Sequence, residues 1–177
     1  DIENLNPAKY VLALDYDTQI PFGALEKLVG TALHPLNKAV VSNTEKTVVS
    51  GYGIFSPKIE NSIESANKTS FSKIMSPSCG INAYNGLSGE KYQDLFSESI
   101  FSGKGLIDVD AFCAVIPNKF PNQKILSHDI LEGIVLRCAF VGDVSFTDSF
   151  PRSLSSFLSR EHRWMRGDIQ NSIFLRL

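Results

Sequence analysis

The chain has 177 residues, enough for one ordinary domain with a buried core. It is 43% hydrophobic and 20% charged, and its formal net charge of −2 argues against nucleic acid as the main partner, because phosphate-binding domains usually carry a basic excess. The three widely spaced cysteines form no Cys-x-x-Cys pair, and no apolar run reaches the roughly 18 residues of a membrane-spanning helix. Since neither an internal repeat nor a linker divides the sequence, we expect 1–177 to form a single domain.

The first half of the chain alternates between strand and helix patterns. A compact apolar run over 9–15 predicts a buried strand, and a proline then opens a helical pattern over 21–33. The patterns over 34–41 and 47–60 predict two further strands. The stretch 60–77 is rich in Ser, Asn, Lys and Thr and weak in periodicity, so we expect a flexible loop there.

The second half continues the alternation. A helical pattern over 88–101 breaks at "SGKG", and a short helix is predicted over 108–116. A third helical pattern covers 128–140, a strand follows over 140–149, and a helix with a basic end covers 152–170. Strands that alternate with helices predict an α/β layered domain.

Two aspartates, Asp15 and Asp17, directly follow the first predicted strand. A solvated turn with an Asp cap for the next helix is one interpretation. A phosphatase of the haloacid dehalogenase type is another, but it requires Thr or Val where this chain has Gln19. The third is a metal-bound nucleotide-sugar site, because Mg²⁺ takes oxygen ligands from one or two carboxylates plus substrate phosphates. Open α/β sheets also place ligands at strand ends.

His128 and Asp129 begin the predicted helix over 128–140. An N-cap role would account for them. The alternative is that Asp129 acts as a catalytic base. The helix dipole favours its ionised form, and a carboxylate within hydrogen-bond reach of a sugar hydroxyl can take that hydroxyl's proton.

A dense basic cluster with the single tryptophan lies in the last predicted helix. Its members are Arg160, His162, Arg163, Trp164 and Arg166. A solvated basic face around a core tryptophan is one interpretation. The other is a site for a leaving diphosphate, since arginine binds phosphate in a bidentate way and fixed positive charge lowers the barrier to departure. Lys104, between two glycines, is a further phosphate candidate, although a plain turn also explains "GKG".

An Asp pair, a later "HD" before a helix, and "HRW" followed by "RGD" occur in the order that resembles the inverting glycosyltransferases of GT-A type. The closer resemblance is to the glycosyltransferase domain of cyclic β-1,2-glucan synthases. It covers most of the chain and is carried by "LDYDTQIPFGALEKLVGTALHPLN", "GYGIFSPKIE", "YQDLFSESIFSGKGLIDVDAF", "ILSHDILEG" and "REHRWMRGDIQ".

The resemblance implies a GT-A (Rossmann-like) fold and transfer of glucose from UDP-glucose to a growing β-1,2-glucan with inversion. It implies that Asp15 and Asp17 hold Mg²⁺ or Mn²⁺ and the nucleotide sugar, that Asp129 is the general base, and that Arg163 and Trp164 face the diphosphate and the acceptor. The remaining substrate-binding candidates are His128, Lys104, Arg160, His162 and Arg166. The broader family has glutamine where this chain has Arg160, so the phosphate contact is expected to be shared differently.

The resemblance also implies a larger protein around this segment. The uracil-binding strands of a GT-A domain precede the Asp pair, and the family's enzymes are large membrane proteins. We therefore expect a partial fold that lacks those strands, the C-terminal part of a glycosyltransferase domain. We expect it to lie at the cytoplasmic face of the bacterial inner membrane within its parent and to be inactive alone. Another processive β-glucan synthase, or a non-catalytic carbohydrate-binding or scaffold segment, remains an alternative.

Overall fold

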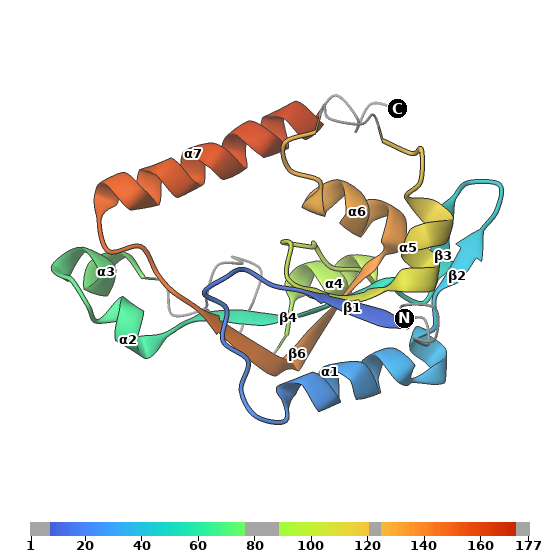
Figure 1. The fold of residues 1–177 in the computed structure, drawn as a ribbon, viewed down its shortest axis with the longest axis horizontal. Helices are drawn as coiled ribbons and strands as arrows, with labels where there is room; N and C mark the ends of the chain where they lie inside the picture. The colour runs from blue at the N-terminus through green and yellow to red at the C-terminus, as the bar shows by residue number, and fades with distance from the viewer. Residues whose placement is uncertain (1–7, 77–88, 121–124, 173–177) are drawn as a thin grey trace, which may run out of the picture.

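The computed structural model describes residues 8–76, 89–120 and 125–172, which fold as helices packed around a four-stranded sheet (Figure 1). In chain order the elements are β1 (Tyr10–Ala13), α1 (Ala24–Leu33), η2 (Pro35–Asn37), β2 (Val40–Ser42), β3 (Thr47–Ser50), β4 (Ile54–Asn61), α2 (Ile63–Ala66), α3 (Ser70–Met75), α4 (Lys91–Phe96), β5 (Gly105–Asp108), α5 (Val109–Val115), α6 (Asp129–Leu136), β6 (Cys138–Asp148) and α7 (Leu154–Asn171). The predicted α/β class is confirmed, and the arrangement is consistent with part of a Rossmann-like domain.

The sheet is mixed, with strand order β1-β5-β4-β6, and β2 and β3 pair separately. β5 runs antiparallel to both β1 and β4, whereas β4 and β6 are parallel. β1, β4 and β6 therefore point the same way. The register pairs Ala13, at the end of β1, with Gly105, at the start of β5. Residues that follow β1, precede β5 or end β6 therefore lie at the same end of the sheet, where β1 and β6 finish and β5 begins.

Helices cover both faces of the sheet (Figure 1). On one face α1 buries Ala24, Leu28 and Ala32 against β4, β5 and β6. On the other face α5 and α6 bury residues that include Val115 and Leu136, together with β3 and the start of β4. Leu28 and Leu136 are both 0% exposed, and full burial of a leucine side chain contributes about 1.5–3 kcal/mol. These two cores hold the sheet in place beneath the site.

The stretch 60–77, expected to be a loop, instead carries two short helices in its described part, which ends at residue 76. Ser62 caps α2, where its side chain accepts a hydrogen bond from the Ser65 amide. Thr69 and Ser72 form a capping box at the start of α3. The Ser and Thr content that indicated a loop therefore supplies helix N-caps.

Other boundaries also differ from the sequence expectations. The helix expected over 128–140 ends at Leu136, because Arg137 has a φ of 55° and the chain then enters the long strand β6. The strand expected over 47–60 is divided into β3 and β4. The four-residue strand β5, which occupies the centre of the sheet, was not predicted at all.

The last helix, α7, begins beside α3 and ends near α6 (Figure 1). The Thr69 hydroxyl donates to the Arg152 carbonyl at 2.9 Å at the first of these ends. At the other, the Asn171 side-chain amide donates to the Ser127 carbonyl at 2.6 Å. Within the described residues, no helix combines the length and the apolar character needed to cross a bilayer.

Candidate functional site

The candidate site lies where β1 and β6 end and β5 begins. Asp15 and Asp17 follow β1, Asp148 ends β6, and Lys104 precedes β5. Neither Asp15 nor Asp17 caps the next helix, since the N-cap of α1 is Gly23, which makes no side-chain cap hydrogen bond. The sheet topology thus gathers charged groups that lie far apart in the sequence.

Lys104 is a buried cation held between two carboxylates. Its side chain is 6% exposed, and its Nζ lies 2.9 Å from an oxygen of Asp15 and 2.9 Å from an oxygen of Asp148. The Thr18 hydroxyl donates to the other oxygen of Asp148 at 2.7 Å. Burial lowers the pKa of Lys104, but the hydrogen bonds and charges of Asp148 and Asp15 outweigh it, so the net pKa is raised. The ammonium expected to meet a phosphate is therefore engaged by protein carboxylates.

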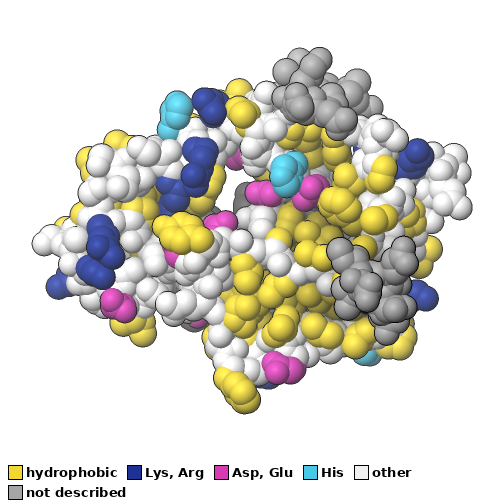
Figure 2. Space-filling model, viewed as in Figure 1, with side chains coloured by type: hydrophobic (Ala, Val, Ile, Leu, Met, Phe, Trp, Pro, Cys, Tyr) yellow, Lys and Arg dark blue, Asp and Glu magenta, His cyan; other side chains and the backbone are white. Residues whose placement is uncertain are grey.

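A cavity of about 1030 Å³ lies between these acids and α7. Its acidic side carries Asp15, Asp17 and Asp148, and the α7 side carries cations and the tryptophan, namely Arg152, Arg160, Arg163 and Trp164. Serine hydroxyls of α7 complete the wall, from Ser155, Ser156 and Ser159. Figure 2 shows the molecule hollowed near the centre of this face, with acidic and basic side chains around the opening.

Arg160 organises the aromatic side chains at the α7 wall. Its guanidinium carbon lies 4.8 Å from the centre of the Trp164 ring and 5.5 Å and 5.7 Å from the rings of Phe150 and Phe157. Burial lowers the pKa of Arg160, yet an arginine remains charged at any physiological pH. These cation–π contacts fix the indole ring beside the cavity. Arg163 also lines the cavity and is exposed there.

A second, smaller cavity of about 180 Å³ adjoins the first and shares Lys104 and Trp164 with it. Asp129 and Asp168 contribute carboxylates to its lining, beside side chains that include Phe101, Ser102, Ser127 and Ile130. The structure therefore brings Asp17 and Trp164 to one cavity, and Asp129 and Trp164 to its neighbour.

Asp129 is the first residue of α6, and the N-cap position belongs to His128, which makes no side-chain cap hydrogen bond. Its carboxylate lies against Gly103, where an added Cβ would come within 2.8 Å of Asp129 Oδ2. Burial raises the pKa of Asp129. The His128 and Lys104 charges oppose that rise, whereas the Asp15 and Asp168 charges add to it. A carboxylate with a raised pKa is a stronger proton acceptor once it is ionised.

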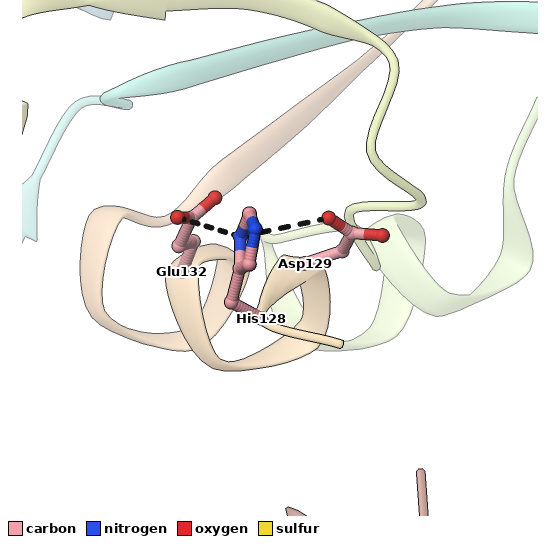
Figure 3. A group of neighbouring side chains, drawn as sticks. All are labelled: His128, Asp129 and Glu132. Carbon is pink, nitrogen blue, oxygen red and sulfur yellow. Dashed lines mark ion pairs between the residues drawn. The ribbon is translucent and has the colours of Figure 1, made fainter. Parts of the chain in front are cut away.

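His128, Asp129 and Glu132 form a cluster on the first turn of α6 (Figure 3). His128 Nδ1 lies 2.9 Å from Glu132 Oε1 and 3.8 Å from Asp129 Oδ1. Burial raises the pKa of Glu132. Nitrogen and oxygen atoms of this kind could hold a metal ion, but a His–Glu pair four residues apart is also an ordinary helix contact.

Three predicted binding residues lie outside both cavities. The His128 side chain is 63% exposed and pairs with Glu132, and neither His162 nor Arg166, both exposed, lines either cavity. Sequence reasoning also missed two residues that do line them, Asp148 and Asp168. Asp148 ends the alternating run of β6, and Asp168 closes the "RGD" triplet, which was noted but given no role.

No known protein-family model matches the chain. A curated protein does match: the chain is 40% identical over 163 residues, 92% of its length, to the cyclic β-(1,2)-glucan synthase NdvB of Rhizobium meliloti strain 1021. This chain is similar to a segment of a cyclic glucan synthase. It spans 6% of that protein's length. The resemblance expected from the five sequence stretches is therefore confirmed at this level.

Proposed function

We propose that the chain is the catalytic and acceptor-binding part of a glucosyltransferase domain within a larger synthase. In this proposal it transfers glucose from UDP-glucose to a growing β-1,2-glucan with inversion, in the GT-A manner. The carrying observation is that Asp17, Asp129 and Trp164 converge around two adjoining cavities. The 40% identity to a cyclic β-(1,2)-glucan synthase segment supports it.

The large cavity suits a nucleoside diphosphate sugar. Arg163 on α7 and Arg152 just before that helix both line it, and their guanidinium groups match phosphate geometry. On the acidic side, Lys104 is shared between two carboxylates, which leaves Asp17 to supply oxygen ligands together with the free oxygen of Asp15. This donor set fits Mg²⁺ or Mn²⁺, which take one or two carboxylates plus substrate phosphates. A bound ion would neutralise charge on the departing diphosphate.

The chemistry itself falls to the chain's own residues. Asp129 takes the proton of an acceptor hydroxyl, whose oxygen attacks the anomeric carbon from the side opposite UDP. The carbon–oxygen bond to UDP breaks, and its electron pair leaves on the diphosphate, where Arg163 stabilises the added charge. Trp164, fixed by Arg160, lines both cavities and orients the sugars between them.

The decisive experiment is Asp129→Asn in the full-length parent synthase. We expect loss of glucosyl transfer by a factor of about 10² or more, because the base is removed, while UDP-glucose binding is retained. Asp143→Asn is the matched control, since Asp143 is exposed and lines neither cavity. Glucosyl transfer is measured with radiolabelled donor, and linkage analysis of the product separates a β-1,2-glucan from any other β-linked glucan.

Normal turnover by the Asp129→Asn enzyme would refute the assignment of the base. A non-catalytic carbohydrate-binding role also predicts normal turnover by this variant. It further predicts that the parent binds glucan at this segment and that substitutions of Asp17 do not change UDP-glucose binding. We expect the segment to be inactive when separated from its parent, because the relative that it matches is far longer.

A further inference from the structure

Asp168 places an uncommitted carboxylate in the small cavity. It lies four residues after Trp164 on α7, so the two side chains share a face of the helix, and both line this cavity. In the described part of the chain, no hydrogen bond or ion pair engages the Asp168 side chain. Its carboxylate is therefore available to a ligand.

Asp168 also stands where a negative charge is unfavourable to the helix. It belongs to the last turn of the 18-residue helix α7, and that turn contains no basic residue. Because the C-terminal end of a helix carries partial negative charge, an aspartate there costs stability. Asp168 is exposed, makes no fold contact among the described residues and gains nothing from helix electrostatics, and its carboxylate lines the cavity.

The cavity walls are held in a fixed relation. The Asn171 side-chain amide donates to the Ser127 carbonyl at 2.6 Å, and the Leu126 amide donates to the Gln170 side chain at 3.1 Å. Gly167 allows the closest approach, since a Cβ there would lie 2.6 Å from the Cβ of Ser127. The end of α7 is thereby bound to the segment that leads into Asp129, so Asp168 and Asp129 occupy set places around one small space.

We propose that the small cavity is a subsite for one sugar ring of the acceptor, and that Asp168 accepts a hydrogen bond from a hydroxyl of that ring other than the one deprotonated by Asp129. This inference rests on the proposed function. A carboxylate accepts hydrogen bonds from sugar hydroxyls, and the indole face of Trp164 offers an apolar surface to a ring. Two hydrogen-bonded hydroxyls fix the ring's rotation and thereby which hydroxyl faces the donor.

The test compares Asp168→Asn with Asp143→Asn in the full-length parent. Rates are measured against added short β-linked gluco-oligosaccharide at saturating UDP-glucose, and against UDP-glucose at saturating oligosaccharide. In the absence of oligosaccharide, the hydrolysis of UDP-glucose, in which water replaces the sugar acceptor, is also measured. We expect Asp168→Asn to raise the acceptor KM at least about tenfold, the effect of weakening a hydrogen bond to a charged group. The donor KM and hydrolysis should stay within about twofold of wild type.

The outcomes are distinct. An acceptor KM that does not change in Asp168→Asn overturns the assignment, and so does a donor KM that rises as much as the acceptor KM. A shift of the pH profile with an unchanged acceptor KM also overturns it, since Asp168 would then act through its charge on Asp129 alone. If the wild-type parent transfers no glucose from UDP-glucose, the proposed function itself fails. Asp168→Asn removes a helix-destabilising charge, so we expect the variant to fold at least as stably as the wild type, and thermal unfolding of the variant checks this.

Discussion

Lys104 illustrates how a single buried charge can organise a site. The Lys104 side chain is only 6% exposed, and a charge buried to this degree is strongly disfavoured unless it has partners of opposite charge. Asp15 and Asp148, at the ends of two different strands, provide those partners. The pairing fixes one oxygen of Asp15 and leaves Asp17, the other member of the pair, free of such a contact within the described residues. Lys104 thus gives the two aspartates different roles.

We predict that Lys104→Met destabilises the chain by about 3–5 kcal/mol, because it leaves a buried carboxylate without its counter-charge. The control is Lys68→Met, which breaks the exposed Lys68–Glu64 pair and should cost no more than about 1 kcal/mol. The pKa of Lys104 is raised in the folded state, so its contribution is complete below the unfolded pKa and is lost only as the pH rises through the folded value. Urea unfolding at neutral pH measures both variants, and equal losses would contradict the prediction.

At the scale of elements, α7 depends on the absence of a side chain at Gly167. The Cβ of an alanine would lie 2.6 Å from the Ser127 Cβ, which is part of a neighbouring backbone segment and not the end of a flexible side chain. The helix and the segment before Asp129 would have to separate. Since Trp164 and Asp168 precede and follow this position, both cavities depend on the contact.

Gly167→Ala should therefore destabilise the chain by about 1–3 kcal/mol through overpacking. Gly30→Ala is the matched control, because Gly30 is also inside a helix, but its added Cβ meets nothing within 4 Å. The control should gain about 0.5–1 kcal/mol from the higher helix propensity of alanine. Denaturant unfolding should therefore give changes in the free energy of unfolding of opposite sign for the two variants. A stabilised Gly167→Ala variant would show that the close approach of α7 to Ser127 is not required.

The sequence predicted elements well where periodicity was long and poorly where it was short. The pattern over 152–170 predicted α7 closely, since 18 helical residues give a clear period. β5 has four residues between a glycine turn and a helix, too few for any alternation to be read. The strand belongs to the centre of the sheet only because its neighbours lie far away in the chain, a tertiary effect that local pattern does not contain.

At the scale of the whole molecule, the sequence motifs singled out several residues that the fold brings to the two cavities of the candidate site. Asp17, Asp129, Arg163 and Trp164 were singled out from their motifs, and the structure places each beside one of two adjoining cavities. The ion-pair partners of Lys104 could not be predicted from the sequence, because its ion pair with Asp148 depends on the strand order β1-β5-β4-β6. The resemblance supplied residue types and order, whereas the ion pairs arise from packing.

The pH dependence of transfer is a property of the assembled molecule, since the charges that act on Asp129 come from four separate parts of the chain. Burial raises its pKa, Asp15 and Asp168 add to the rise, and His128 and Lys104 oppose it. Because the base must be ionised, activity should fall as the pH drops through this raised pKa, so the acid limb lies at a higher pH than an unperturbed aspartate would give.

His128→Gln removes the side chain whose electrostatic interaction lowers the pKa of Asp129, so it should shift the acid limb of transfer to still higher pH. His162→Gln is the control, because His162 is exposed and lines neither cavity. Rate profiles of the parent synthase across the acidic range test this. An acid limb that moves equally in both variants, or in neither, would contradict the electrostatic account.

The place of β1 in the sheet has a practical consequence. β1 pairs with β5 on one side, and among the described residues no strand pairs with its other side. That outer row of amide and carbonyl groups, next to a Val11 that is 51% exposed, is a ready template for a strand from another molecule. We therefore expect this segment to self-associate when it is prepared apart from its parent, and we expect Val11→Lys to reduce that association.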